Sequence, residues 1–375
     1  MACVSNGLIV GGGIAGLSAA IALGRVGVHC DVVEIADAPL GASLALSGRA
    51  TDALAELGVY DECYKTGRPF TPDSTAASQN DATGRMLSAG PTRPQWPGAK
   101  TPVGMYRPVF VQILTDAALR LGAKIQKGLT IETIEDRDNA SFVILDNGEE
   151  RRYDFVIGAD GIGSRTRALI FPDAPEPAYS GQMSIRWVIS GPAIAGEGWY
   201  IAPLGRLGFY ALPHQGLVYV PLVISMPEKK LTQAEVYSLV KDLLDSYTAP
   251  AVVELRRHLT PSSDLICRPF KWILVPPPWH RGRTLLIGDA AHATTAHMGM
   301  GGGMALEDAV VLAQCIAAAS TLAQAYDAFM SRRLERVRTV VETSVTMSRI
   351  EQAGTPRLEN IALMSSALAA IAQPY

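Results

Sequence analysis

The sequence predicts an α/β fold: a parallel-sheet domain, an antiparallel sheet inserted into it, and helices at the C-terminal end. Three observations predict this arrangement. The N-terminus runs from a short apolar strand through a glycine-rich turn into a helical stretch; two later apolar strands each end at a carboxylate; and residues 182–226 divide into short strands separated by glycine and proline. The chain has 375 residues, more than one typical domain, so at least two hydrophobic cores are expected.

The composition is that of an ordinary globular protein and excludes several function classes. Hydrophobic residues make up 48% and charged residues 18% of the chain, which excludes a disordered or collagen-like protein. The formal net charge is −3, so nucleic acid is not expected as a partner. The 5 cysteines lie far apart without CxxC spacing, which is typical of reduced thiols in the cytoplasm, and the 6 histidines lack metal-ligand spacing. We therefore expect a cytoplasmic protein without a metal site.

Two uncharged stretches, residues 6–24 and 309–326, are long enough to raise the question of a membrane span. The first is interrupted by glycines, and the second is rich in alanine and contains Gln314 and Gln324. We interpret both as buried helices of a soluble protein with no membrane partner.

The densest basic run, residues 331–338, has the spacing of an amphipathic helix. Leu334, Val337 and Val341 fall on one face of that helix. The spacing predicts a solvated opposite face that carries the four arginines of the run: Arg332, Arg333, Arg336 and Arg338.

The N-terminal elements are typical of a Rossmann-like dinucleotide-binding domain. Residues 7–10 form an apolar strand, 11–16 read GGGIAG, 17–26 have helical spacing and 30–35 form a second strand. The first motif glycine permits a tight turn, the second allows backbone to approach a pyrophosphate, and the third allows the helix to pack on the strand. Glu34, at the end of the second strand, is placed to accept hydrogen bonds from an adenosine ribose. This group predicts an ADP-containing cofactor, NAD or FAD, bound by Gly11, Gly13, Ile14, Ala15, Gly16 and Glu34.

Two later segments repeat the pattern of a buried strand that ends at a carboxylate. In 155–167, FVIGADGIGSRTR, Asp160 ends the strand and Ser164 can cap the next helix. In 284–309, the strand ends in Gly288-Asp289. Carboxyl ends of parallel strands meet at one crevice, so we expect Asp160 and Asp289 to line the cofactor site.

A glycine cluster after the second carboxylate is predicted to begin a helix near residue 301. Its glycines leave backbone N–H groups accessible where the helix dipole favours negative charge, and if the cofactor is FAD they could face the anionic reduced flavin ring. The alternative is that these glycines only allow close helix packing. The cluster comprises Gly299, Gly301, Gly302 and Gly303.

Three motifs, GGGIAG, GADGIGSRTR and LLIGDAAH, closely resemble those of the single-component (class A) FAD-dependent aromatic monooxygenases, the para-hydroxybenzoate hydroxylase-like family. The resemblance implies FAD, with Asp289 at the ribityl chain, Asp160 where flavin and pyridine nucleotide meet, and Arg107 reaching FAD from a helix. It also implies NAD(P)H as electron donor, molecular oxygen as co-substrate, and hydroxylation of a small aromatic substrate through a flavin hydroperoxide. Ala296 stands where the family usually has proline, and Val111 where it often has glutamine.

Two other functions stay open at this point. The same fold hosts FAD-dependent reductases and dehydrogenases that insert no oxygen, and a non-enzymatic flavin-binding or scaffold protein is a further alternative.

The antiparallel sheet is predicted to bind the substrate. We expect an FAD-binding domain of residues 1–70, 100–180 and 268–330, a sheet domain of 71–99 and 181–267, and C-terminal helices in 331–375, broken near 354–356. Residues 90–102, rich in proline and glycine, are expected to cross between domains. A helix after the sheet begins with a capping box, Thr232 and Glu235. The C-terminal helices could cover the FAD domain or a second copy in a homodimer.

Substrate-binding residues are expected on one face of this sheet, where aromatic and polar side chains occur. For each of them taken alone, a packed sheet residue or a solvated edge is the more common case. The candidates are Arg186, Trp187, Tyr200, Tyr210, His214 and Tyr219. His297, in the loop between Asp289 and the glycine-rich helix, is a further candidate for the pocket. We predict His297, Arg186 and Tyr210 as the catalytic residues.

Overall fold

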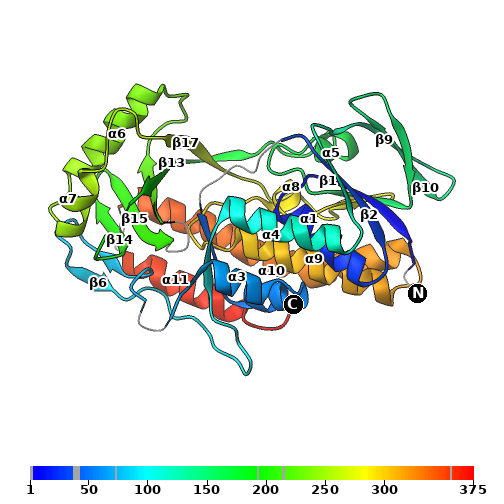
Figure 1. The fold of residues 1–375 in the computed structure, drawn as a ribbon, viewed down its shortest axis with the longest axis horizontal. Helices are drawn as coiled ribbons and strands as arrows, with labels where there is room; N and C mark the ends of the chain where they lie inside the picture. Colours follow the sequence, from blue (N-terminus) through cyan, green and yellow to red (C-terminus); the bar gives the residue numbers. More distant parts are fainter. Residues whose placement is uncertain (1–2, 37–42, 72–73, 192–193, 213–215, 355–356) are drawn as a thin grey trace.

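A computed structural model describes residues 3–36, 43–71, 74–191, 194–212, 216–354 and 357–375. Two sheets lie at opposite ends of the molecule, and the long helices α9 (Gly301–Ala318) and α10 (Leu322–Gln352) run between them (Figure 1). Each sheet has its own hydrophobic core. The two expected cores are therefore confirmed.

The first sheet has six strands in the order β18-β19-β12-β1-β2-β8. All neighbours are parallel except the β18–β19 pair at one edge. This is the predicted parallel sheet, with β1 and β12 side by side so that the first two motifs meet. Its strands are β1 (Asn6–Val10), β2 (His29–Glu34), β8 (Lys124–Lys127), β12 (Phe155–Gly158), β18 (His280–Arg281) and β19 (Thr284–Leu286).

Side chains alternate between the two faces of this sheet. Ile9 and Ile157 belong to the helical core formed with α1 (Ile14–Arg25), α4 (Arg107–Arg120), α9 and α10. Leu8 and Val156 instead pack against an antiparallel ribbon on the other face. That ribbon consists of β9 (Ile131–Arg137), β10 (Ala140–Leu145) and β11 (Glu150–Tyr153).

One helix among the described residues, α9, is long and apolar enough to span a membrane. It packs between α1, α2 (Arg49–Glu56) and α10, and most of it is buried inside the protein. The uncharged stretch 309–326 is not a single helix, because α9 ends at Ala318 and α10 begins at Leu322.

A small three-stranded sheet connects the two ends of the molecule. Its order is β3-β7-β4, formed by β3 (Ser43–Leu46), β7 (Val103–Tyr106) and β4 (Arg68–Pro69), with α3 (Tyr60–Thr66) beside it. Residues 89–102 contain no helix or strand, as expected for a crossing segment, and form the loop that extends below α3 in Figure 1.

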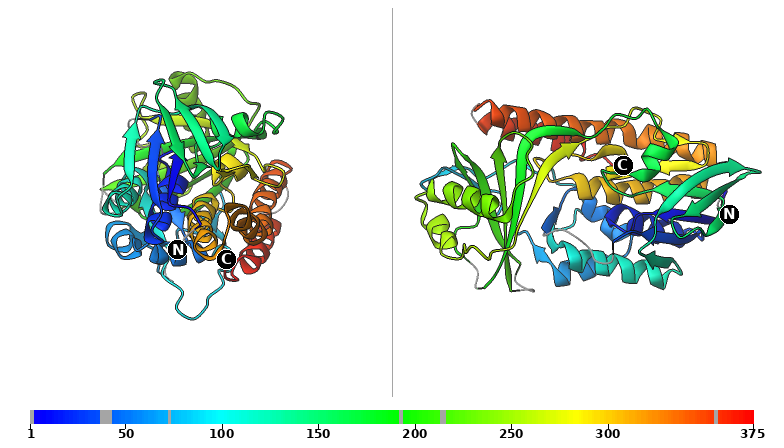
Figure 2. Two further views of the ribbon diagram at one scale, coloured as in Figure 1. Left: turned by 90° about the vertical axis from the view of Figure 1, so that its right-hand side faces the viewer. Right: turned by 90° about the horizontal axis from the view of Figure 1, so that it is seen from above.

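The second large sheet has seven strands in the order β17-β13-β16-β15-β14-β5-β6, antiparallel except for β14–β5. Helices α6 (Gln233–Asp245) and α7 (Pro250–Arg256) cover its outer face, and the predicted capping box at Thr232 is present (Figure 2). The predicted boundary at 267–268 falls inside β17. The strands are β5 (Gln79–Asn80), β6 (Met86–Ser88), β13 (Ala178–Ser190), β14 (Gly198–Ala202), β15 (Gly205–Leu212), β16 (Leu217–Ser225) and β17 (Leu265–Trp272).

The C-terminal region forms two antiparallel helices, α10 and α11 (Arg357–Ala370), that lie along one side of both sheets (Figure 2). The predicted break near 354–356 is confirmed, although α10 begins at Leu322 rather than after the basic run. The short helices α5 (Arg165–Ile170) and α8 (Asp289–His292) complete the fold.

The prediction that the basic run is solvated was wrong for Arg333 and Arg336. The Arg333 side chain is 0% exposed and pairs with Glu307 and Asp308 of α9, while Arg336 also binds Glu307. The helical periodicity of the run was correct, but the sequence around it does not reveal the two acids on a neighbouring helix.

Candidate FAD and substrate site

The turn between β1 and α1 has the geometry that its three glycines predict. Gly11 has φ +108°, and a Cβ there would lie 2.4 Å from the carbonyl oxygen of Ala159. A Cβ on Gly16 would lie 1.9 Å from the carbonyl oxygen of Gly11, so helix and strand pack without room for a side chain. Gly13, the N-cap of α1, has no heavy atom within 4 Å of its Cβ position and no side-chain cap. The turn thus leaves an open approach to the uncapped start of a helix, which suits a pyrophosphate.

Glu34 lies beside this turn. Its Oε2 accepts a hydrogen bond from Gly12 N at 2.6 Å and its Oε1 accepts one from Ala36 N at 2.8 Å. The carboxylate is therefore fixed next to the glycine turn, where the ribose contact was predicted. That contact itself stays a prediction.

Asp160 accepts hydrogen bonds from residues at the start of α5. It accepts hydrogen bonds from Ser164 Oγ at 2.5 Å and from Thr166 N at 2.8 Å, and Ser164 caps α5 as predicted. Arg167 is buried and donates to the carbonyl oxygens of Ala290 and Ile162, which ties α5 to α8. Both residues thus hold local structure beside the cofactor motifs, and the nucleotide role of Asp160 stays a prediction.

Asp289, the first residue of α8, is exposed, yet the surrounding protein raises its pKa by desolvation. Both statements hold for a side chain that faces a recess inside the molecule. Electrostatic interactions with His292 and Arg107 act in the opposite direction and lower the pKa of Asp289. Desolvation lowers the pKa of Arg107. The charge of Asp289 acts to raise that pKa, and the charge of Arg186 acts to lower it further. Groups from α8, α4 and β13 therefore act on one another electrostatically across this recess.

The glycine cluster begins α9 as predicted, with Gly301 as its first residue and no side-chain cap. A Cβ on Gly302 would lie 3.1 Å from Leu44 Cδ1, and one on Gly303 would lie 3.0 Å from Ala50 Cβ. Close packing therefore explains these two glycines in part. Gly299, with φ +66°, has no heavy atom within 4 Å of its Cβ position, and its backbone is open to a ligand.

Arg186, Tyr210 and Tyr219 share one face of the seven-stranded sheet. Tyr210 and Tyr219 are directly paired across β15 and β16, with ring centroids 5.5 Å apart. The Tyr210 hydroxyl donates to Ser43 Oγ at 3.0 Å, so this face is turned toward β3 and the FAD-binding end. Burial raises the pKa of Tyr219, and the charge of Arg186 partly offsets that rise. The structure thus brings these three predicted residues together.

The other sheet candidates do not join them. Trp187 and Tyr200 were predicted on the substrate face but lie in the core against α6 and α7. Trp187 follows Arg186 directly, and adjacent strand residues point to opposite faces. His214 lies outside the described residues.

His297 lies between β17 and the end of α10. Its Nδ1 is 2.9 Å from Thr295 Oγ1, its ring meets Phe270 edge-on, and its Nε2 is 3.8 Å from Glu351 Oε2. The side chain is buried. A catalytic role for His297 stays a prediction.

The β1–α1 turn, the space beside Asp289 and the starts of α1 and α9 have the chemistry that FAD requires. An open Gly13 and two uncapped helix N-termini suit a negatively charged dinucleotide, and Asp289 supplies an acceptor for a hydroxylated chain. A model of the FAD binding domain family matches residues 5–344 of the chain. The chain belongs to this family.

Relatives of known name agree with this assignment. Aurachin C monooxygenase/isomerase of Stigmatella aurantiaca is 31% identical over 353 residues, which covers 92% of this chain and 89% of that protein. The 2-heptyl-3-hydroxy-4(1H)-quinolone synthase of Pseudomonas aeruginosa is 30% identical, covering 93% and 90%. The chain is an FAD-dependent monooxygenase, and its resemblance to class A enzymes is confirmed.

Solved structures share the fold. Klebsiella pneumoniae HpxO, complexed with FAD and uric acid, superposes with a TM-score of 0.77 at 21% identity and covers 98% of this chain and 97% of its own. The 2-methyl-3-hydroxypyridine-5-carboxylic acid oxygenase gives a TM-score of 0.77 at 21% identity, covering 98% and 96%.

Two features of this FAD-dependent monooxygenase escaped the sequence analysis. Arg68 and Glu197, 129 positions apart, form a half-buried ion pair beside Tyr210. No local pattern marks them. Glu307 and Asp308 are fully buried on the apolar helix α9, and such an acidic pair in an otherwise apolar helix was a signal that a buried cation faces it.

Proposed function

We propose that this monooxygenase hydroxylates a small, electron-rich aromatic or heteroaromatic ring, with NAD(P)H as electron donor. One atom of molecular oxygen enters the ring and the other leaves as water, while NAD(P)H supplies two electrons. Two kinds of relative support a nitrogen heterocycle as the substrate. The Pseudomonas aeruginosa relative is a 2-heptyl-3-hydroxy-4(1H)-quinolone synthase, and a Klebsiella oxytoca relative is an FAD-dependent urate hydroxylase. The observation that carries the proposal is the sheet face of Arg186, Tyr210 and Tyr219, turned toward the FAD-binding end.

FAD, when bound, supplies the oxygen chemistry. The chain binds it at the β1–α1 turn and at the starts of α8 and α9. Arg186 gives the substrate face a positive charge that favours a deprotonated hydroxyl or lactam on the ring. Deprotonation raises the electron density of the ring, which is what an electrophilic oxygen needs. Tyr210 and Tyr219 form an aromatic wall that orients the ring.

Labelled oxygen tests the proposal. Purified protein with FAD is supplied with NADH or NADPH and a panel of 4-quinolones, hydroxypyridines and purines under ¹⁸O₂, with catalase present. We expect one substrate class to accelerate NAD(P)H oxidation and to gain one labelled atom per molecule. Oxidation of NAD(P)H with no label in any product would overturn the proposal and favour a reductase or dehydrogenase of the same fold. A protein that does not hold FAD would indicate a non-enzymatic role.

The cellular setting is also a proposal. The 5 cysteines are all free thiols, which supports a reducing compartment, and we propose the cytoplasm. Fractionation of cells that express the protein tests this. Measurement of mass in solution tests the possible homodimer.

A further inference from the structure

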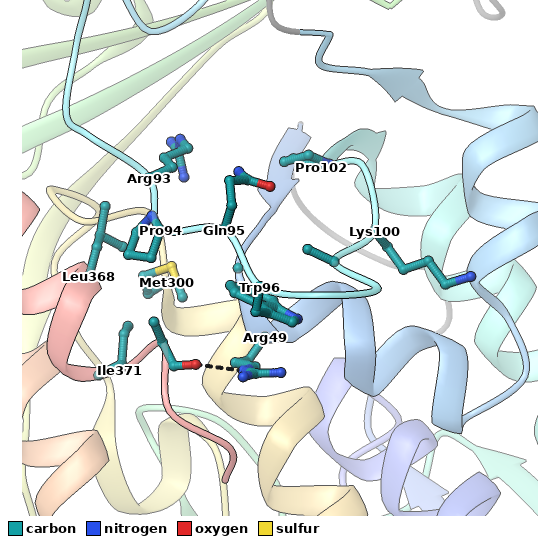
Figure 3. Close-up of a pocket in the computed structure, with 13 residues that line it drawn as sticks. Arg49, Arg93, Pro94, Gln95, Trp96, Lys100, Pro102, Met300, Leu368 and Ile371 are labelled. Atoms are coloured by element: carbon teal, nitrogen blue, oxygen red, sulfur yellow. Dashed lines mark hydrogen bonds between the residues drawn. The ribbon is translucent and has the colours of Figure 1, made fainter.

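A pocket lies beside the flavin-binding segment but on different elements from the substrate face. The crossing loop, the start of α2, the start of α9 and the end of α11 border this pocket, which is partly open to solvent and has a cavity volume of about 40 Å³ (Figure 3). Its lining includes Gly48, Arg49, Arg93, Trp96, Met300 and Leu368.

Arg93 brings to this pocket a positive charge that no carboxylate among the described residues pairs with. Its Nη1 donates to Ser47 Oγ at 2.7 Å, which uses one of the five N–H donors of a guanidinium. Arg93 is exposed to solvent on one side, while the protein around the rest of the side chain lowers its pKa by desolvation. Within the described part of the chain, its hydrogen bonds include none to a carboxylate. The uncapped N-terminus of α2, at Gly48, adds a partial positive charge to the same lining.

The other two cations of the lining are already engaged. Arg49 stacks on Trp96 at 4.0 Å, pairs with Asp52 and donates to the carbonyl oxygen of Ala372. Lys100 points outward in Figure 3 and lies over the Tyr60 ring. Arg93 is therefore the cation with donors to offer an anion, while Arg49 holds the indole of Trp96 in place.

The remaining lining is apolar. Met300 and Leu368 are buried, and Ile371 and Pro94 lie beside them. Met300 stands between Gly299 and Gly301, so an occupant of the pocket contacts the segment predicted to face the flavin. An anionic end and an apolar wall within one small pocket suit a flat organic acid rather than an inorganic anion.

We propose that this pocket binds a small aromatic carboxylate, with the carboxylate on Arg93 and the ring against Trp96, Met300 and Leu368. The site is separate from the substrate face of Arg186 and Tyr219. Because it adjoins the start of α9, its occupant changes the surroundings of bound FAD.

Titration of the FAD-loaded enzyme with benzoate, followed by calorimetry, tests the proposal. Benzoate should still bind the Arg186→Gln variant, because the substrate face is not part of the proposed site. The affinity for benzoate should fall at least tenfold in the double variant that also carries Arg93→Gln. Arg257→Gln, an exposed arginine paired with Glu254 on α7, is the matched control and should leave binding unchanged. Neutral benzamide and inorganic phosphate should each bind at least tenfold more weakly than benzoate.

Fluorescence locates the site. Benzoate should quench Trp emission saturably, and Trp96→Phe should remove that signal while calorimetric binding remains within threefold. If Arg93→Gln fails to fold, Arg93→Lys should fold and bind benzoate at reduced affinity. Benzoate binding that is indifferent to Arg93, or equal binding of benzamide or phosphate, would overturn the proposal.

Discussion

Arg333 Nε donates to Asp308 Oδ1 at 2.8 Å, and both side chains are fully buried. The other oxygen of Asp308 accepts from Gly288 N at 2.9 Å and lies 2.7 Å from His292 Nε2. This one carboxylate therefore joins α10 to the turn that presents Asp289. A residue of the C-terminal helices thereby supports the cofactor recess.

Removal of Arg333 should damage both stability and cofactor binding. Arg333→Met leaves Asp308 buried without its arginine and Glu307 paired with Arg336 alone, and the loss of a buried partner costs about 3–5 kcal/mol. Urea unfolding of the apoprotein measures the loss, and FAD titration should show weaker binding because the Gly288 turn is less fixed. Arg338→Gln, on the same helix but partly exposed, should cost less than about 1 kcal/mol. Equal effects of the two variants would contradict this interpretation.

Asp289 should show a conflict between stability and binding. Its pKa is raised in the folded state, so the ionised carboxylate opposes folding once the pH exceeds the unfolded value of about 3.9. Asp289→Asn should therefore make the apoprotein more stable at pH 7, and the difference should disappear as the pH falls below the unfolded value. The same variant should bind FAD more weakly. Thermal unfolding across pH measures the first effect, and an Asn variant that is less stable at pH 7 would refute it.

Gly13 and Gly16 should separate binding from folding. Gly16→Ala places a methyl group against the carbonyl oxygen of Gly11 and should destabilise the protein by about 1–3 kcal/mol or more. Gly13→Ala adds a methyl group in open space, so the apoprotein should unfold at an unchanged urea concentration. FAD affinity should nevertheless fall for Gly13→Ala, because the methyl group occupies the approach to the start of α1. FAD binding unaffected by Gly13→Ala would place the pyrophosphate elsewhere.

Arg186 and Tyr210 should have different effects on catalysis. Arg186→Gln should lower kcat/KM by about 10²-fold or more, the scale of general acid–base effects, and should raise the pH at which activity appears. Tyr210→Phe removes the hydrogen bond to Ser43 and should cost about 0.5–1.5 kcal/mol of stability. Its pH profile should not move. A shifted profile for Tyr210→Phe would make its hydroxyl a proton-transfer group.

The sequence was sufficient wherever a local rule decides the structure. The tight turn at Gly11, the Ser164 cap and the Thr232 capping box each depend on a few consecutive residues, and all were predicted. Strand alternation alone requires Trp187 to lie on the face opposite Arg186, so the sequence is sufficient to exclude Trp187 from the substrate face.

Pairings between distant segments were beyond such rules. Arg333 looks like a solvated residue until Asp308, 25 positions earlier, is placed on the facing helix. Arg93 likewise acquires its surroundings from three other elements. The substrate itself is still less accessible from sequence, since it depends on the shape of the space between two sheets.

The length of α10 has a mechanical consequence. Its 31 residues extend about 46 Å. About 27 Å of that length separates the Arg333–Asp308 pair at the FAD end from Glu351, which accepts hydrogen bonds from Arg206 and Gln182 of the second sheet. Because α10 is bonded to the FAD end through Arg333 and to the second sheet through Glu351, the two sheets cannot move apart as independent bodies. We expect a single cooperative unfolding transition for the whole chain, and the movements that admit and release substrate must arise in the loops rather than between the domains.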